Sequence, residues 1–136
     1  MKTIVLGYDD SPEAGRATQR TAEIAKALDA RVIVTSVAPI LMPAAHGVGP
    51  YDPADPPERH EALARDAATA LEEQGVDAEC ATPMGDPGDA IVRVADAHEA
   101  DLIVLGMTDH PHLARLLGSV SDDVAHHAHC DVLLVH

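Results

Sequence analysis

Short apolar runs alternate along this chain with longer segments in which apolar residues recur every three or four positions. The runs have little polar alternation, which is typical of strands buried on both faces of a sheet, whereas the longer segments favour amphipathic helices. The predicted strands are Thr3–Gly7, Arg31–Val37, Val76–Thr82, Asp101–Leu105 and Asp131–Val135, the third being weaker and nearer an edge. Helices are predicted to begin at Ser11 and to span about Pro57–Gln74, Pro87–His98 and Ser119–His127.

The first predicted helix has clear start signals. Ser11 can cap its free N–H groups, Pro12 suits the first helical position, and Glu13 suits the first turn. The residues predicted to face the core are Ala14, Ala17, Thr21, Ile24, Ala25 and Leu28 in this helix, and Ile91, Val92, Val94 and Ala95 in the third. The segment Ala38–Pro57 contains six prolines and is predicted to be a loop.

Five strands that alternate with helices predict a single α/β domain over residues 1–136. Right-handed crossovers make the sheet parallel and place helices on both of its faces. Ligands of such sheets bind beyond the carboxyl ends of the strands, where the strand order reverses. We therefore expect the functional residues directly after the first, second and fourth strands.

The chain is strongly acidic, with 23 acidic and 9 basic side chains and a formal net charge of −14. Charge of this sign repels nucleic acids and anionic membranes, so neither is expected as a partner. No apolar run is long enough for a membrane span or a signal peptide, which favours a cytoplasmic protein. Two interpretations of the acidity stay open, namely adaptation to high salt and an ordinary acidic protein.

The cysteines and histidines form no strong metal-binding pattern. Cys80 and Cys130 are far apart and are expected to be buried reduced thiols, although the spacing leaves a disulfide open. His110 and His112 can point the same way and are weak candidate metal ligands, but a solvated loop is the preferred interpretation. A second group is interpreted as complementing the dipole at the end of the last helix: His126, His127 and His129.

The most informative stretch is D-L-I-V-L-G-M-T-D-H-P-H-L-A-R-L-L-G-S-V-S, residues 101–121. Its apolar run ends at Gly106, and Gly118 and Ser119 stand at the start of a predicted helix. Glycine at a strand end lets a ligand approach the backbone, and a helix start offers free N–H groups at the positive end of the helix dipole. This arrangement predicts a phosphate-binding site.

The ends of the first two strands offer further candidates, each with a plain alternative. Tyr8 and Asp9 follow the first strand, and Asp9 either binds ribose hydroxyls or a metal that bridges phosphates, or is only an acid at a helix start. Val37 follows the second strand with Ala38 and Pro39, and their backbone and apolar side chains either hold a flat base or merely end a strand.

Taken together, these pieces resemble the universal stress protein family over essentially the whole chain. The resemblance rests on I-V-L-G-Y-D-D-S at residues 4–11, G-D-P-G-D-A-I at 85–91, D-L-I-V-L-G at 101–106, L-G-S-V-S-D-D-V at 117–124 and C-D-V-L-L-V at 130–135. It implies a five-stranded parallel sheet in the order 3-2-1-4-5. It also implies a homodimer in which the last strands, here Val132–Val135, pair across a two-fold axis.

Nucleotide-binding members of this family carry G-x2-G-x9-G-[ST] after the fourth strand. By resemblance, Gly106 matches the first glycine and is followed by Met107, while Gly118 and Ser119 match the final pair. Val120 and Ser121 follow that pair, and the other matches are Asp9 for the acid that contacts the nucleotide and Val37 for the residue beside the adenine. The implied ligand is ATP or another adenine nucleotide, with Mg²⁺ as an optional companion.

The chain departs from this motif at its middle glycine, because Asp109 occupies that position and the loop is one residue short. A carboxylate there repels phosphate oxygens, and two unit charges about 4 Å apart cost about 4 kcal/mol at an effective dielectric constant of about 20. A bound Mg²⁺, or a loop that turns Asp109 outward, cancels this penalty. We therefore expect adenosine or a monophosphate to bind more readily than a triphosphate.

Three functions follow from the resemblance. The first is a homodimeric stress-response regulator in which an adenine nucleotide orders the Met107–Leu117 loop and changes the surface offered to a protein partner. The second is a dimeric interaction module that binds no nucleotide. The third is a slow ATPase, but Ser119 and Ser121 have no evident base, and neither a G-x4-G-K-[ST] nor a G-x-S-x-G motif is present.

Overall fold

The computed structural model describes residues 2–40, 52–107 and 120–136. Its strands are β1 (Lys2–Gly7), β2 (Ala30–Thr35), β3 (Ala78–Ala81), β4 (Leu102–Gly106) and β5 (Asp131–Val135). Its helices are α1 (Pro12–Leu28), α2 (Pro57–Glu73), α3 (Pro87–Ala97) and α5 (Val120–His127). All strand pairs are parallel and the order is β3-β2-β1-β4-β5, so the predicted fold class and the strand order implied by the resemblance are confirmed.

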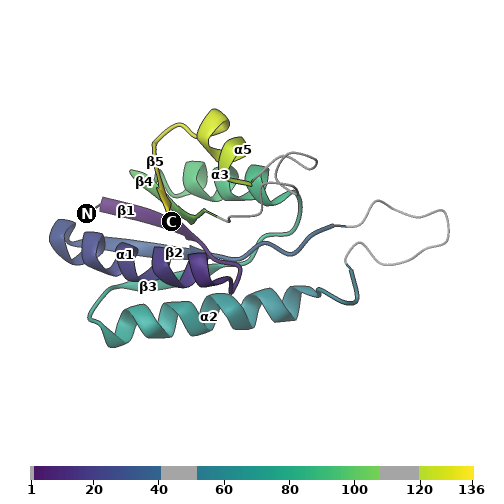
Figure 1. Ribbon diagram of the computed structural model, residues 1–136, viewed down its shortest axis with the longest axis horizontal. Coiled ribbons are helices and arrows are strands. Elements are labelled where there is room, and N and C mark those ends of the chain that lie inside the picture. Colours follow the sequence, from purple (N-terminus) through teal and green to yellow (C-terminus); the bar gives the residue numbers. More distant parts are fainter. Residues whose placement is uncertain (1, 41–51, 108–119) are drawn as a thin grey trace.

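Two apolar cores lie on opposite faces of the sheet. Helices α1 and α2 cover one face, and α3 and α5 cover the other (Figure 1). Alternate residues of β1 supply both cores, with Ile4 and Leu6 on the α1 and α2 side and Val5 on the other. The helices contribute mostly alanine to the first core, which lets their backbones approach the sheet closely.

The strand β1 lies at the centre of the sheet, and the chain moves outward from it in both directions. Its pairing with β2 ends at Gly7 and Thr35, and its pairing with β4 ends at Leu6 and Val104. The order of the strands reverses at this point, so the connections after β1 and after β4 leave toward opposite faces. The carboxyl ends of β1, β2 and β4 therefore meet at the same end of the sheet, as predicted, and we call this end the carboxyl edge.

Caps fix the helix starts near this edge. The Ser11 Oγ accepts a hydrogen bond from the Ala14 N–H at 3.1 Å, which confirms the predicted start of α1. At α3, the Asp86 carboxylate accepts from the Asp89 N–H at 3.2 Å.

Among the described residues, no helix has the length and apolar character that crossing a bilayer requires.

Several details of the prediction are wrong. The strand β2 ends at Thr35 rather than Val37, because β1 turns away into α1 and leaves the chain beyond Thr35 without a partner on that side. The edge strand β3 is limited to Ala78–Ala81. Leu28 is 51% exposed rather than buried, because α1 ends there and the left-handed Asp29, with φ of 51°, turns the chain back toward β2.

The expected burial of the thiols is also wrong for Cys80, which is exposed on β3, while Cys130 is half-buried just before β5. Both thiols are free. Because β3 and β5 are the two opposite edges of the sheet, the two cysteines of one chain cannot form a disulfide. Partial burial raises the pKa of both thiols above the usual value, which keeps them protonated at neutral pH.

Candidate functional site

The turn from β1 into α1 is built from two aspartates. The Asp9 Oδ1 accepts a hydrogen bond from the Ser11 N–H at 3.1 Å, and Asp10 adopts the left-handed conformation with φ of 65°. Aspartate tolerates that conformation better than most residues because its short side chain bonds locally. Asp9 thus shapes the turn, as its plain interpretation expects, while its exposed carboxylate lies at the edge where a ligand is expected.

Tyr8 packs against the core beneath α1 and α2, with its hydroxyl near the Asp10 carboxylate at 3.4 Å. Burial and then the negative charge of Asp10 raise the pKa of the Tyr8 phenol above its usual value. The phenol is therefore a neutral hydrogen-bond donor at physiological pH. It lies on the α1 and α2 side of the site.

The chain beyond β2 is held on one side only. The Ser36 N–H donates to the Ala81 carbonyl oxygen at 3.2 Å, and the Ala38 N–H donates to that of Pro83 at 3.0 Å, both on the β3 side. Val37 lies between them, and its backbone N–H and carbonyl oxygen point the opposite way, toward β1. There the last backbone contact is the Tyr8 N–H to the Thr35 carbonyl oxygen at 2.9 Å. Within the described ranges, the Val37 N–H and carbonyl oxygen have no hydrogen-bond partner.

The end of β4 lies directly against the first turn of α1. A Cβ added to Gly106 would lie 2.5 Å from the Glu13 carbonyl carbon and 2.7 Å from the Ala14 nitrogen. The Met107 N–H then donates to the Val135 carbonyl oxygen at 2.7 Å, which keeps the chain beside β5. Gly106 is thus required for packing in this chain, whatever its contact with a ligand.

The start of α5 completes the described part of the site. Val120 is 38% exposed, whereas Ser121 is buried. The first turn of α5 also packs closely on α3, because a Cβ added to Gly88 would lie 2.7 Å from the Asp123 Cβ. Five candidate residues lie outside the described part of the chain: Asp109, His110, His112, Gly118 and Ser119. The described structure thus brings together Tyr8, Asp9, Val37, Gly106 and Met107 at the carboxyl edge.

The histidines at the end of α5 bond to the helix itself. The Nδ1 atoms of His126 and His127 donate to the carbonyl oxygens of Asp122 and Asp123, at 2.7 and 2.8 Å. His129 instead pairs with the Asp96 carboxylate at 3.0 Å. In the ranges that the structure describes, no three metal-ligating side chains gather at one point.

Next to Val37, three side chains form a hydrogen-bonded chain that was not predicted from the sequence, and we call it the Ser36–His60–Asp55 relay. The Ser36 Oγ lies 2.7 Å from His60 Nδ1, and His60 Nε2 lies 2.8 Å from Asp55 Oδ1. Ser36 is 1% exposed and His60 is 6% exposed. The only sequence signal was a histidine on the buried stripe of α2, four residues before Ala64.

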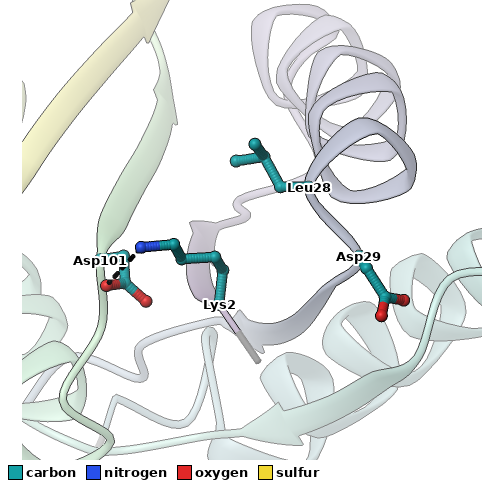
Figure 2. A pocket seen from close by; sticks show the side chains of 4 residues that line it. All are labelled: Lys2, Leu28, Asp29 and Asp101. Atoms are coloured by element: carbon teal, nitrogen blue, oxygen red, sulfur yellow. Dashed lines mark ion pairs between the residues drawn. The ribbon is translucent and has the colours of Figure 1, made fainter.

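A shallow hollow of about 400 Å³ lies at the opposite end of the sheet (Figure 2). It is lined by Lys2, Leu28, Asp29 and Asp101, and the Lys2 ammonium points toward the Asp101 carboxylate at 3.9 Å. Both charged groups are largely exposed, so the pair contributes little to stability. This hollow lies at the amino ends of β1 and β4, away from the edge where parallel sheets bind ligands.

The fold defines a class, namely Rossmann-like α/β domains with a five-stranded parallel sheet, and the candidate residues lie at the carboxyl ends of its central strands. The family model of the universal stress protein family matches residues 1–136, and the chain belongs to this family.

Relatives and solved structures agree with this assignment. A universal stress protein of Mycobacterium tuberculosis strain H37Rv is 37% identical over 99% of this chain and 96% of its own length. One of Methanocaldococcus jannaschii is 37% identical over 98% and 81%. A solved universal stress protein in complex with cAMP is 34% identical, covers 99% of this chain and 96% of its own, and has a TM-score of 0.75. The Archaeoglobus fulgidus protein in complex with dAMP is 26% identical, covers 100% and 98%, and has a TM-score of 0.77.

The close contact at Gly106 predicts the effect of a small substitution. In Gly106→Ala the new methyl group meets main-chain atoms of α1, which cannot move without shifting the whole helix. We expect a loss of about 1–3 kcal/mol in the free energy of unfolding, measured by urea denaturation.

The matched control is Gly15→Ala on the exposed face of α1, where no described atom lies within 4 Å of the added Cβ. Alanine is the better helix former, so this variant is expected to gain about 0.5–1 kcal/mol. Equal urea midpoints for Gly106→Ala and the parent protein would contradict the packing role of Gly106.

Proposed function

We propose that this chain is a homodimeric, cytoplasmic stress-response regulator that binds an adenine nucleotide at the carboxyl edge of its sheet. The observation that carries the proposal is the backbone of Val37, beside the end of β1, whose N–H and carbonyl oxygen bond to no residue that the structure describes. A backbone N–H and carbonyl oxygen left without partners at a partly covered position favour a ligand that satisfies both. The solved relatives in complex with cAMP and dAMP support a ligand with an adenine base.

The donor and acceptor of Val37 suit the edge of adenine. Adenine offers the N1 acceptor to the Val37 N–H and its 6-amino donor to the Val37 carbonyl oxygen. Guanine carries an N1–H donor and a 6-oxo acceptor at the same positions, so both contacts become repulsive. A mismatch that leaves such groups unpaired costs about 1–3 kcal/mol, which corresponds to roughly ten- to hundredfold in affinity.

The remaining candidates divide the rest of the nucleotide between them. Asp9, at the end of β1, is assigned to the ribose hydroxyls, which a carboxylate accepts well. The side assigned to phosphate is bordered by Gly106 and Met107 at the end of β4, and by Val120 and Ser121 at the start of α5. Tyr8 closes the α1 side as a neutral donor. Gly118, Ser119 and Asp109 belong to the same motif by sequence.

Calorimetric titration tests this proposal with AMP, GMP, and ATP in the presence and absence of Mg²⁺. We expect AMP to bind, GMP to bind at least about tenfold more weakly, and ATP to gain affinity when Mg²⁺ is present, because the cation offsets the charge of Asp109. No heat and no thermal shift with any adenine nucleotide, for a folded protein, would instead favour the alternative of a dimeric module without a nucleotide.

Asp109 predicts how many phosphates the site accepts. If its carboxylate repels the phosphate chain, Asp109→Gly should raise the affinity for ATP by about tenfold or more, with a smaller effect on AMP because AMP carries less charge. Asp109→Asn removes the charge but keeps the side chain, so it separates repulsion from the backbone freedom that glycine supplies. Unchanged ATP affinity in both variants, measured by calorimetry, would show that Asp109 lies away from the phosphates.

The free edge of β5 supports the homodimer. Val132–Val135 are apolar and only half-buried, and in the described chain no strand pairs with the outer side of β5. The opposite edge, β3, is short and carries the exposed Glu79, which discourages pairing. Pairing of β5 with its copy across a two-fold axis would satisfy the outward backbone groups and cover the apolar side chains.

Proline substitution on β5 tests this interface. The Val135 carbonyl oxygen points toward β4 and accepts a hydrogen bond there. By strand alternation, the backbone N–H and carbonyl oxygen of Leu133 also point toward β4, while those of Val132 point outward. Val132→Pro is therefore expected to yield a folded monomer in sedimentation equilibrium, whereas Leu133→Pro breaks the pairing with β4 and destabilises the fold. A monomeric parent protein, or a dimeric Val132→Pro variant, would rule out this interface.

A further inference from the structure

The Ser36–His60–Asp55 relay joins three parts of the chain at the end of β2. Ser36 directly follows that strand, His60 lies in the first turn of α2, and Asp55 precedes the helix. The Asp55 Oδ1 also accepts a hydrogen bond from Arg59 Nη1 at 2.8 Å, which anchors the outer end of the relay. A carboxylate only accepts hydrogen bonds, so His60 Nε2 is the donor to Asp55. In the neutral imidazole, Nδ1 then accepts from the Ser36 hydroxyl.

The relay contains a serine, a histidine and an aspartate, but its geometry does not suit a nucleophile. Ser36 is 1% exposed, so no substrate carbonyl or phosphate reaches its Oγ. The buried position suits a structural contact between side chains. Burying such a network is costly compared with an apolar contact of the same size. We therefore expect the relay to hold a neighbouring group in place.

The relay holds Ser36, the residue directly before Val37. Three backbone hydrogen bonds hold the segment from Ser36 to Ala38 on the β3 side: the Ser36 and Ala38 N–H groups donate, and the Ala38 carbonyl oxygen accepts from Gly85. On the β1 side, no described residue bonds to its backbone. The Ser36 side chain points to the α2 face, where His60 meets it, and Val37 packs into the opposite core. The relay is thus a fourth contact that holds this short segment, and it acts from the α2 face, where none of the three backbone hydrogen bonds lies.

We propose that the Ser36–His60–Asp55 relay positions the Val37 backbone for base recognition, with His60 as the central positioning residue. This inference rests on the proposed adenine-nucleotide site. A donor and acceptor that are already fixed pay little ordering entropy when the base arrives, so affinity and the preference for adenine over guanine both increase. Loss of the relay leaves the segment attached only along its β3 side. The two Val37 groups can then move away from the repulsive edge of guanine, and they also hold adenine less firmly.

Three substitutions separate the two halves of the relay. Ser36→Ala removes the hydroxyl next to Val37 with almost no change in volume. His60→Gln places its amide near the position of Nε2 and keeps the contact with Asp55, whereas His60→Asn places its amide near Nδ1 and keeps an acceptor for Ser36. Calorimetry with AMP and with GMP, together with a thermal unfolding midpoint, is recorded for each variant.

We expect Ser36→Ala and His60→Gln to weaken AMP binding by about tenfold and to narrow the AMP-to-GMP affinity ratio. His60→Asn is expected to retain most of the affinity and selectivity. The control is Leu71→Ala, a cavity variant farther along the same buried stripe of α2, which lowers the unfolding midpoint but leaves the affinity ratio unchanged.

Two other results overturn the inference. If Ser36→Ala and His60→Gln keep the parent affinity and selectivity, or if Leu71→Ala narrows the ratio equally, the relay serves stability alone while the proposed nucleotide site stands. If the parent protein binds neither AMP nor GMP, the proposed function and this inference fail together.

Discussion

The strands β1 and β2 share a ladder of backbone hydrogen bonds up to Gly7 and Thr35 and then part, and the candidate site depends on this parting. Beyond it, β1 turns into α1 through Asp9 and Asp10, while the chain after β2 continues along the β3 side to the bridge between Ala38 and Met84. A parallel sheet forces such a division, because each strand must leave through a crossover helix. The division leaves the Val37 backbone facing the gap.

Small residues let the backbones around the candidate site pack closely. Gly106 lets the end of β4 touch the main chain of α1, and Gly88 lets α3 touch the first turn of α5. The chain contains neither phenylalanine nor tryptophan, so α1 and α2 approach the sheet mostly through alanine, while α3, α5 and the strands use valine, isoleucine and leucine. Close approach of the backbones brings the strand ends and helix starts within reach of one small ligand.

The architecture could be predicted from the sequence because its signals are local. The apolar runs, the Ser11-Pro12 start of α1 and the prolines after β2 each depend on a few neighbouring residues. Leu28 was wrongly predicted to be buried, because periodicity does not reveal where a helix extends beyond the sheet that it covers. The open backbone of Val37 was only partly foreseen, since the pattern suggested a base-binding strand end but could not show which groups stay unpaired.

The relay was beyond prediction for a different reason. His60 follows the helical period of α2, but no shared period links it to Ser36 or Asp55, and the contact of the three depends on how α2 docks on the sheet after a connection of about twenty residues. A histidine on a buried stripe signals that some polar partner exists, because an unpaired imidazole in a core is costly. It does not identify the partner. Long-range polar contacts of this kind require the packed structure.

The negative charge of the protein affects ligand binding differently on the phosphate side and on the base side of the proposed site. A net charge of −14 opposes any anionic ligand over the distance of a Debye length, about 8 Å at physiological salt. Attraction of phosphate therefore has to come from local N–H groups, and each added phosphate meets more repulsion from the surrounding carboxylates. The base side is neutral main chain and is insensitive to that field. For a nucleotide bound as proposed, selectivity for the base is then independent of salt, whereas affinity for the phosphates rises as salt screens the acidic surface.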